Sequence, residues 1–232
     1  MTLELRNHMI DICRRMNAAG INQGTSGNLS VRNGDSILIT PTSLRYELMQ
    51  PSDIVEMDFN GGYYGERLPS SEWRFHRDIL SAKKDRNAVL HCHSSYAVTL
   101  ACHRREIPPF HYMIGLAGGT TIRCADYAAY GTQELSDNAL RALEGRDACL
   151  LANHGQIAVG NDLERAFRIA VEVETLAKQY VQALIIGEPT HLDDAEMAQV
   201  LGQMRQMSYG RSSEKPGSTS LLTKRAGSSV VT

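Results

Sequence analysis

The chain has 232 residues, of which 42% are hydrophobic and 22% are charged, and its formal net charge at pH 7 is -2. This composition is typical of a globular protein, and the length suits one domain with one substantial core. A nearly neutral chain without a run of about 18 apolar residues gives no support to nucleic-acid binding, membrane-surface binding or a membrane span.

Helical and strand periodicities alternate along the chain. Apolar residues at helical spacing over 3–19 predict a first helix that ends at Gly20. A polar loop over 22–28 then leads into a hairpin whose turn is Asn33-Gly34, a pair typical of two-residue turns. Apolar runs predict further strands at 54–59, 88–93, 148–151 and 157–159, with two or three short ones within 110–127. Periodic segments predict further helices at 70–84, 94–105, 134–145, 162–186 and 193–207.

Strand pairs between helices predict an α/β fold with a mixed, largely antiparallel sheet rather than a doubly wound parallel one. Residues 1–209 form this single predicted domain. Residues 210–232 are rich in Ser, Gly and Lys/Arg and predict a disordered tail, because they bury too little apolar surface to offset the entropy of ordering. The amino terminus lacks the apolar stretch of a signal peptide, and five scattered cysteines without a C-x-x-C pair favour free thiols in the cytoplasm.

Two histidines one residue apart, His91 and His93, lie in the apolar segment Ala-Val-Leu-His-Cys-His. On a strand both imidazoles project from one face and Cys92 from the other. His154 lies in an Asn-His-Gly turn between two predicted strands. Three imidazoles with one exchangeable position are typical of a catalytic zinc site rather than a structural one. The spacing alone leaves a metal site and hydrogen-bonded core histidines as alternatives.

Glu72 lies in the first turn predicted for the 70–84 helix, where the helix dipole favours a carboxylate. A solvated glutamate at a helix start is the alternative. Ser70, Ser71 and the backbone amides of this helix start could bind an anion, and the loop 24–28 and the turn 40–43 could add donors. A donor-rich pocket beside a metal suggests a sugar phosphate, and the chain lacks the G-x-x-x-x-G-K-[ST] pattern of nucleotide binding.

Six segments together identify a likeness to a known family. They occur in this order: Gly24–Arg32, Ile39–Thr42, Leu68–His76, His91–His93, His111–Ile114 and Asn153–Gly155. In these segments the chain resembles the class II aldolase/adducin-head family, over about residues 2–210. The resemblance implies a single-domain sandwich with a largely antiparallel sheet flanked by helices. It also implies a fourfold-symmetric homotetramer whose active sites lie between subunits.

The resemblance implies a role for each matching residue. His91, His93 and His154 would hold one zinc ion per subunit, with Glu72 as the fourth ligand at rest and the acid/base during the reaction. The residues that match the family's phosphate pocket are Thr25, Asn28, Thr42, Ser43, Ser70 and Ser71.

Two tyrosines would complete the site. Tyr112 would reach into a neighbouring subunit's site as a proton donor and acceptor, and Tyr209 would close over the site from the C-terminal segment. Two positions depart from the family members that cleave L-fuculose 1-phosphate. Ser43 replaces a glycine, and Tyr130 replaces a phenylalanine beside the aldehyde end of the substrate.

The implied activity is the reversible, zinc-dependent cleavage of a ketose 1-phosphate to dihydroxyacetone phosphate and an aldehyde. Candidate substrates are L-fuculose 1-phosphate, 5-deoxyribulose 1-phosphate and 5-methylthioribulose 1-phosphate. A pentulose-phosphate 4-epimerase and a methylthioribulose-1-phosphate dehydratase are alternatives within the family. An adducin-like binding module is a third alternative, although such modules lack the complete metal set. His76, one turn after Glu72, is interpreted as a packed or hydrogen-bonded residue, with a supporting role beside Glu72 as the alternative.

Overall fold

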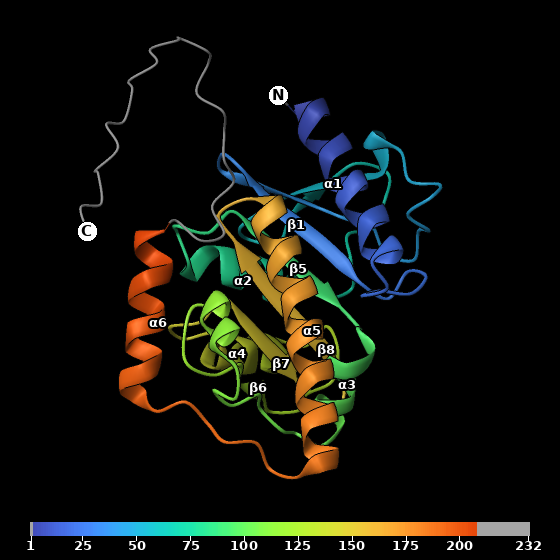
Figure 1. The fold of residues 1–232 in the computed structure, drawn as a ribbon. Coiled ribbons are helices and arrows are strands. Elements are labelled where there is room, and N and C mark those ends of the chain that lie inside the picture. Colours follow the sequence, from blue (N-terminus) through green and yellow to red (C-terminus); the bar gives the residue numbers. More distant parts are fainter. Residues whose placement is uncertain (1, 208–232) are drawn as a thin grey trace, which may run out of the picture.

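The computed structural model describes residues 2–207, which Figure 1 draws in colour. Tyr209 and the predicted tail 210–232 lie outside the described residues. The centre of the structure is an eight-stranded sheet in the order β4-β3-β2-β1-β5-β8-β7-β6. Its strands are β1 (Asn28–Asn33), β2 (Ser36–Ile39), β3 (Val55–Asp58), β4 (Tyr63–Tyr64), β5 (Ala88–Cys92), β6 (Cys124–Ala125), β7 (Ala148–Leu151) and β8 (Gly155–Gly160).

The sheet is mixed and largely antiparallel, as predicted. β6 and β7 pair in parallel, and every other pair of neighbouring strands is antiparallel. Strand β5 lies between β1 and β8, and all five of its residues are buried. A strand covered on both faces favours apolar residues on both, which explains the apolar run that surrounds His91 in this segment.

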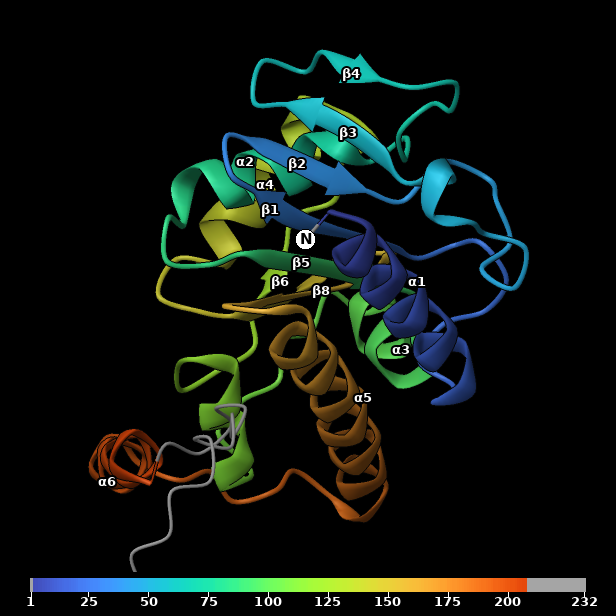
Figure 2. The ribbon, with the colours of Figure 1, turned by 90° about the horizontal axis from the view of Figure 1, so that it is seen from above.

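Helices cover both faces of the sheet (Figure 2). Their bounds are α1 (Thr2–Ala18), α2 (Trp73–Ala82), α3 (Ser95–Cys102), α4 (Gln133–Ala142), α5 (Leu163–Ile186) and α6 (Asp194–Gln206). One apolar core joins the sheet to α1, α3 and α5, and the other joins it to α2 and α4. Alternation along β5 divides its side chains between these cores: Ala88, Leu90 and Cys92 enter the first and Val89 the second.

The helix predicted over 70–84 begins later, at Trp73. Pro69 forms an antiparallel bridge with Pro41, the backbone N–H of Ser70 donates to the carbonyl of Thr40, and Ser71 and Glu72 form a turn that leads into the helix. Glu72 is therefore the residue that precedes the helix rather than a member of its first turn. Its side chain makes no capping hydrogen bond and remains available to the site.

The strands predicted within 110–127 are mostly wrong. The apolar run Tyr112–Ala117 forms a 3-10 helix, η2, and only Cys124–Ala125 joins the sheet as a strand. A short apolar run does not by itself distinguish a helix from a strand. Here the residues at the two ends of the run favour the helical turn. The His111 side chain accepts from the N–H of Met113, and Gly118 ends the turn with a φ of 90°.

Helix α6 packs outside the two layers, against η2 (Figures 1 and 2). Met204 and Leu201 of α6 lie so close to Gly115 that a Cβ there would come within 3.0 Å of the Met204 sulfur. Within residues 2–207, no helix is long and apolar enough to span a bilayer.

Candidate metal centre and active site

Three histidine side chains converge where the central strands end. His91 lies in β5, His93 follows one residue beyond its end, and His154 occupies the turn between β7 and β8. The antiparallel pairing of β5 with β8 sets His91 opposite Ile157 and so brings this turn beside the end of β5. One ligand atom from each histidine lies within 4.8 Å of the others, and Nε2 of His91 is 2.9 Å from Nε2 of His93. The predicted histidine cluster is therefore assembled in the folded chain.

Burial holds these imidazoles in the neutral form. It lowers the pKa of His91 and that of His154 to about 3, and it also lowers the pKa of His93. Nδ1 of His91 donates to the carbonyl oxygen of Gln156 at 2.9 Å, which leaves its Nε2 lone pair directed at the cluster. A backbone carbonyl that fixes the tautomer in this way is typical of metal-binding histidines.

The Glu72 carboxylate lies against the same cluster. Its Oε2 is 3.3 Å from Nε2 of His91, and its Oε1 is 3.2 Å from Nε2 of His154. The side chain is only 6% exposed, and Oε1 has no hydrogen-bond partner among the described residues. A divalent cation placed between the imidazole lone pairs and the carboxylate oxygens would satisfy all four groups at once. Three imidazole nitrogens and one carboxylate oxygen are a donor set that suits a divalent metal.

A pocket of about 300 Å³ opens from this cluster. Its lining combines Glu72 and two of the histidines with Ser71, Asn153 and the segment 127–130, where Tyr130 is 72% exposed at the rim. The next residue, Gly131, packs against the backbone of Ser71. Its φ is 73°, and a Cβ at this position would lie 2.7 Å from the carbonyl oxygen of Ser71. Only glycine permits that approach.

The residues that match the phosphate pocket lie on three neighbouring segments. Ser70 is buried and its Oγ accepts from the N–H of Glu72, whereas Ser71 is exposed to the pocket. The bridge between Pro41 and Pro69 carries the Thr42–Ser43 turn beside these serines. Ser43 has a φ of 56°, in the left-handed region that favours glycine, which agrees with the glycine that the family resemblance implies at this position.

The remaining predicted residues are placed differently. Thr25 is exposed in the loop before β1. The Asn28 side chain is turned toward Glu72, to which its Nδ2 donates at 2.9 Å. Tyr112 begins η2, is 49% exposed and does not line the pocket described above. Tyr209 lies outside the described residues.

Sequence reasoning interpreted His76 as a packed or hydrogen-bonded residue, which the structure confirms, but it did not identify the partners that connect His76 to Glu72. His76 is fully buried, and its two ring nitrogens lie 2.7 Å from Ser30 Oγ and 2.6 Å from Asn28 Oδ1. The four-residue spacing from Glu72 was the one available signal, because it places both side chains on the same side of a helix. The partners Ser30 and Asn28 lie more than 40 residues away, so no local pattern reveals them.

The fold and the centre define a metal-dependent enzyme built on a mixed sheet. Residues 7–181 match the family described as Class II Aldolase and Adducin N-terminal domain. The chain is 50% identical over 214 residues to the 5-methylthioribulose-1-phosphate/5-deoxyribulose-1-phosphate aldolase of Rhodospirillum rubrum, a match that covers 92% of this chain and 96% of the relative. It is 46% identical over 208 residues to the L-fuculose phosphate aldolase of Escherichia coli K12, covering 89% and 96%.

A solved structure of an L-fuculose 1-phosphate aldolase superposes with a TM-score of 0.85 at 42% identity, over 87% of this chain and 96% of the other. The chain belongs to the class II aldolase and adducin N-terminal domain family, and within it the chain is a class II aldolase, an aldehyde lyase. The family assignment from six sequence segments is confirmed.

Proposed function

We propose that this aldolase reversibly cleaves a ketose 1-phosphate to dihydroxyacetone phosphate and an aldehyde, with one zinc ion per subunit. The observation that carries the proposal is the buried Glu72 oxygen, which has no hydrogen-bond partner within residues 2–207 and lies among three neutral imidazoles at the base of a pocket. The names of the relatives, which are aldolases for 5-methylthioribulose 1-phosphate, 5-deoxyribulose 1-phosphate or L-fuculose 1-phosphate, support the substrate class.

His91, His93 and His154 are the residues that would hold the ion. When bound, a divalent metal supplies Lewis-acid polarisation of the ketose carbonyl. Cleavage breaks the C3–C4 bond, and its electron pair stays on C3 while the C4 hydroxyl loses its proton and becomes the aldehyde. Glu72, held beside the cluster, delivers a proton to C3 and so completes dihydroxyacetone phosphate. In the synthetic direction the same carboxylate removes that proton.

The proton from the C4 hydroxyl passes, in this proposal, to Tyr112 of a neighbouring subunit. The exposure of Tyr112 and its absence from the lining of its own chain's pocket support a role in another subunit's site. Tyr209 would close over the site. We therefore propose a homotetramer with active sites at its subunit interfaces.

The substrate phosphate would bind at the start of α2 and in the two loops beside it. Ser70 and Ser71 precede the helix, and Thr42 and Ser43 lie across the Pro41–Pro69 bridge. Thr25 and Asn28 are the other proposed donors. Hydroxyls and amides at a helix start stabilise an anion without a charged side chain. Tyr130 at the pocket rim would contact the aldehyde end.

The first test is a coupled assay for dihydroxyacetone phosphate with the zinc-loaded protein, with and without a chelator. It compares L-fuculose 1-phosphate, 5-deoxyribulose 1-phosphate and 5-methylthioribulose 1-phosphate. We expect chelator-sensitive product from at least one of them, and the three rates rank the substrates. Absence of product from all three, with a 4-epimer or a dehydrated product appearing instead, would contradict the proposal.

The interfacial site is tested by mixing two inactive variants, Glu72→Gln and Tyr112→Phe, after dissociation and reassembly. If Tyr112 serves a neighbouring site, some sites in the mixed oligomer regain both native residues, and activity returns. Activity that stays at the level of the separate variants would place both residues in one chain's site. Light scattering on the native protein gives the subunit number. A cytoplasmic location, supported by the buried free thiols of Cys13, Cys92 and Cys149, is tested by cell fractionation.

A further inference from the structure

His76 is a buried histidine to which the proposed reaction gives no task. It lies in α2, is 0% exposed and does not line the pocket. Both of its ring nitrogens have hydrogen-bond partners: Ser30 Oγ at 2.7 Å from Nδ1 and Asn28 Oδ1 at 2.6 Å from Nε2. Two short hydrogen bonds hold the buried imidazole in one orientation. The imidazole in turn holds the side chains of Ser30 and Asn28 in place.

The direction of these bonds follows from the carboxylate at their end. Asn28 Nδ2 lies 2.9 Å from Glu72 Oε2. If the amide were turned over, its oxygen would face the carboxylate and two acceptors would repel, so the amide nitrogen must donate to Glu72. The amide oxygen then faces His76 and needs a donor, which requires the proton on Nε2. Nδ1 is left as an acceptor for the Ser30 hydroxyl.

Every donor in this row therefore points toward Glu72: Ser30 to His76, His76 to Asn28, and Asn28 to the carboxylate. Burial lowers the pKa of His76 well below its usual value, which keeps the ring neutral and preserves one donor and one acceptor nitrogen. This row of Ser30, His76 and Asn28 contacts Glu72 only through Oε2. The other oxygen, Oε1, receives no hydrogen bond within the described part of the chain and faces His154.

We propose that His76 is a positioning residue which, through Asn28, holds Oε2 of Glu72 and thereby keeps Oε1 directed at the histidine cluster, where the proposed reaction takes place. This inference rests on the proposed function of Glu72. The terminal torsion of a glutamate has a broad energy well, so the carboxylate needs an external bond to stay in one orientation. Without the Nε2 donor the Asn28 amide can turn, and the carboxylate loses its fixed partner.

The test isolates the proton transfer assigned to Glu72. The zinc-loaded enzyme is given dihydroxyacetone phosphate in D2O without aldehyde, and deuterium entry at the hydroxymethyl carbon is followed by NMR. His76→Leu removes the donor, and His76→Gln retains an amide N–H near the position of Nε2. Outer hydrogen-bond partners at metal sites typically contribute 10- to 100-fold, so we expect His76→Leu to lower kcat for exchange by about that factor. Zinc content should stay within about twofold, and KM for dihydroxyacetone phosphate should change less than kcat, because Asn28 is one of six proposed phosphate donors.

His76→Gln should keep most of the exchange rate, and Ser30→Ala should lose several-fold because the ring is then free to change tautomer. Ile79→Val, a buried change on the same helix, is the matched control: it should lower the unfolding temperature without changing kcat. Equal losses in His76→Gln and His76→Leu, or a loss of kcat that follows zinc content, would overturn the positioning role. If His76→Leu does not fold, the test relies on Ser30→Ala and His76→Gln. A native exchange rate in Ser30→Ala together with a large loss in His76→Gln would contradict the proposed positioning role.

The wild-type protein separates this inference from the proposed function. If the zinc-loaded wild type neither exchanges deuterium nor cleaves any ketose 1-phosphate, the proposed function fails. If the wild type is active and Glu72→Gln is not, while the His76 variants match the wild type, only the positioning role fails.

Discussion

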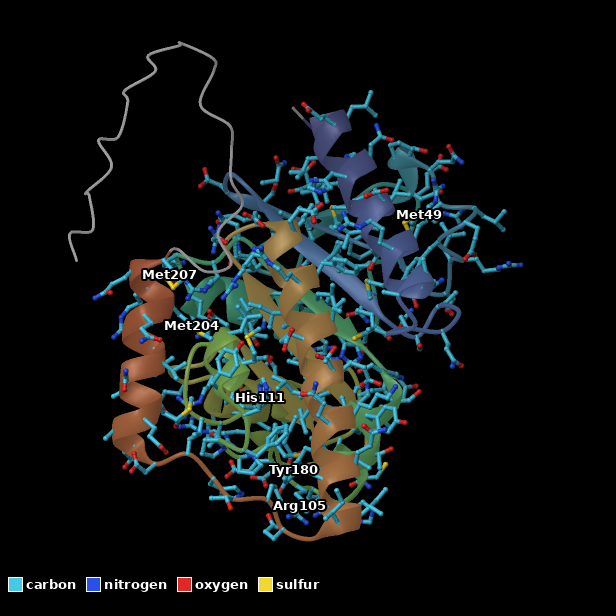
Figure 3. All side chains as sticks on the ribbon, in the orientation of Figure 1. Met49, Arg105, His111, Tyr180, Met204 and Met207 are labelled. Carbon is cyan, nitrogen blue, oxygen red and sulfur yellow. The ribbon has the colours of Figure 1, made fainter. Side chains whose placement is uncertain are left out.

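The molecule contains two groups of polar side chains with similar contact distances and different surroundings. One is the buried group around Glu72. The other lies at the C-terminal end of α5, where Arg105 donates to the Tyr180 hydroxyl at 2.7 Å and to Glu188 at 2.7 Å (Figure 3). Arg105 and Glu188 are 41% and 56% exposed, whereas the His91 side chain is fully buried. The distances are alike, so burial is the difference that matters.

Exposure leaves Arg105 and Glu188 in their ordinary charge states. Its hydrogen bonds to Glu188 and Tyr180 raise the pKa of Arg105, and the bond from Arg105 lowers the pKa of Glu188, so both ions stay charged at neutral pH. Water can replace either partner at little cost. Around Glu72 burial limits contact with water, and it keeps the histidines neutral. Buried polar groups that receive few hydrogen bonds from water need another partner, and a metal ion or a substrate proton can be that partner.

The largest expected effect is that of Glu72→Gln. General acid–base groups contribute about 10²- to 10⁴-fold, so kcat should fall by about that factor while the fold persists. Steady-state kinetics and zinc analysis on the same preparation provide the measurement. The control is Glu188→Gln in the exposed group, which should leave turnover unchanged. Native turnover in Glu72→Gln would remove the functional distinction between the two groups.

Gly155→Ala should disturb the histidine cluster by crowding the backbone next to it. An added Cβ would lie 2.6 Å from the carbonyl oxygen of Cys92 and 2.9 Å from Cδ2 of His93. Overpacking of this kind costs about 1–3 kcal/mol of unfolding free energy, and displacement of His93 should lower zinc affinity. Gly202→Ala in α6 is the matched control, since a Cβ there meets nothing within 4 Å. Urea unfolding and zinc titration would test both, and equal stability of the two variants would contradict the prediction.

Tyr130→Phe should have a smaller effect, confined to substrate choice. The residue lines the pocket rim and is largely exposed, so loss of its hydroxyl should change the ratio of kcat/KM between two ketose 1-phosphates by about 10-fold or less. Competition assays measure this ratio. Tyr64→Phe on the exposed strand β4 is the control and should leave the ratio unchanged. An unchanged ratio in Tyr130→Phe would place the aldehyde end elsewhere.

The smallest effect concerns an exposed ion pair between α1 and α5. Glu164 accepts from Arg15 at 2.6 Å, and this bond lowers the pKa of Glu164 from 4.5 to about 2. Because the folded pKa is depressed, the stabilisation is complete above about pH 4.5 and is lost as pH falls toward 2. The pair is partly exposed, so Glu164→Gln should cost about 0.5 kcal/mol at pH 7.

Urea unfolding between pH 7 and pH 3 would measure that cost. The difference between the wild type and Glu164→Gln should narrow as the pH falls through the lower half of this range. Arg45, which forms an exposed contact with Glu47, provides the matched control: Arg45→Gln should change the unfolding free energy less at every pH. A difference that grows toward low pH would have the wrong sign.

Much of the fold and part of the site could be predicted from local patterns. The alternation of His91, Cys92 and His93 in an apolar strand predicts two imidazoles on one face, and Asn33-Gly34 predicts a hairpin. Both predictions are confirmed. The run Tyr112–Ala117 lies within 110–127, where short strands are predicted, but it is a 3-10 helix. Its apolar residues alone do not distinguish the two structures, whereas its capping residues and its contact with α6 favour the helix.

The sequence by itself determined the strand and helix periods and the residue types of the centre, because each depends on neighbours a few positions apart. The order of strands and helices along the chain also indicated a mixed sheet. Only the tertiary structure decided which of these residues meet. Asn28 reaches Glu72 across 44 positions, and the Gln156 carbonyl reaches His91 across 65. Such contacts depend on which strands lie side by side, and that order is set by the packing of the whole chain around its two cores.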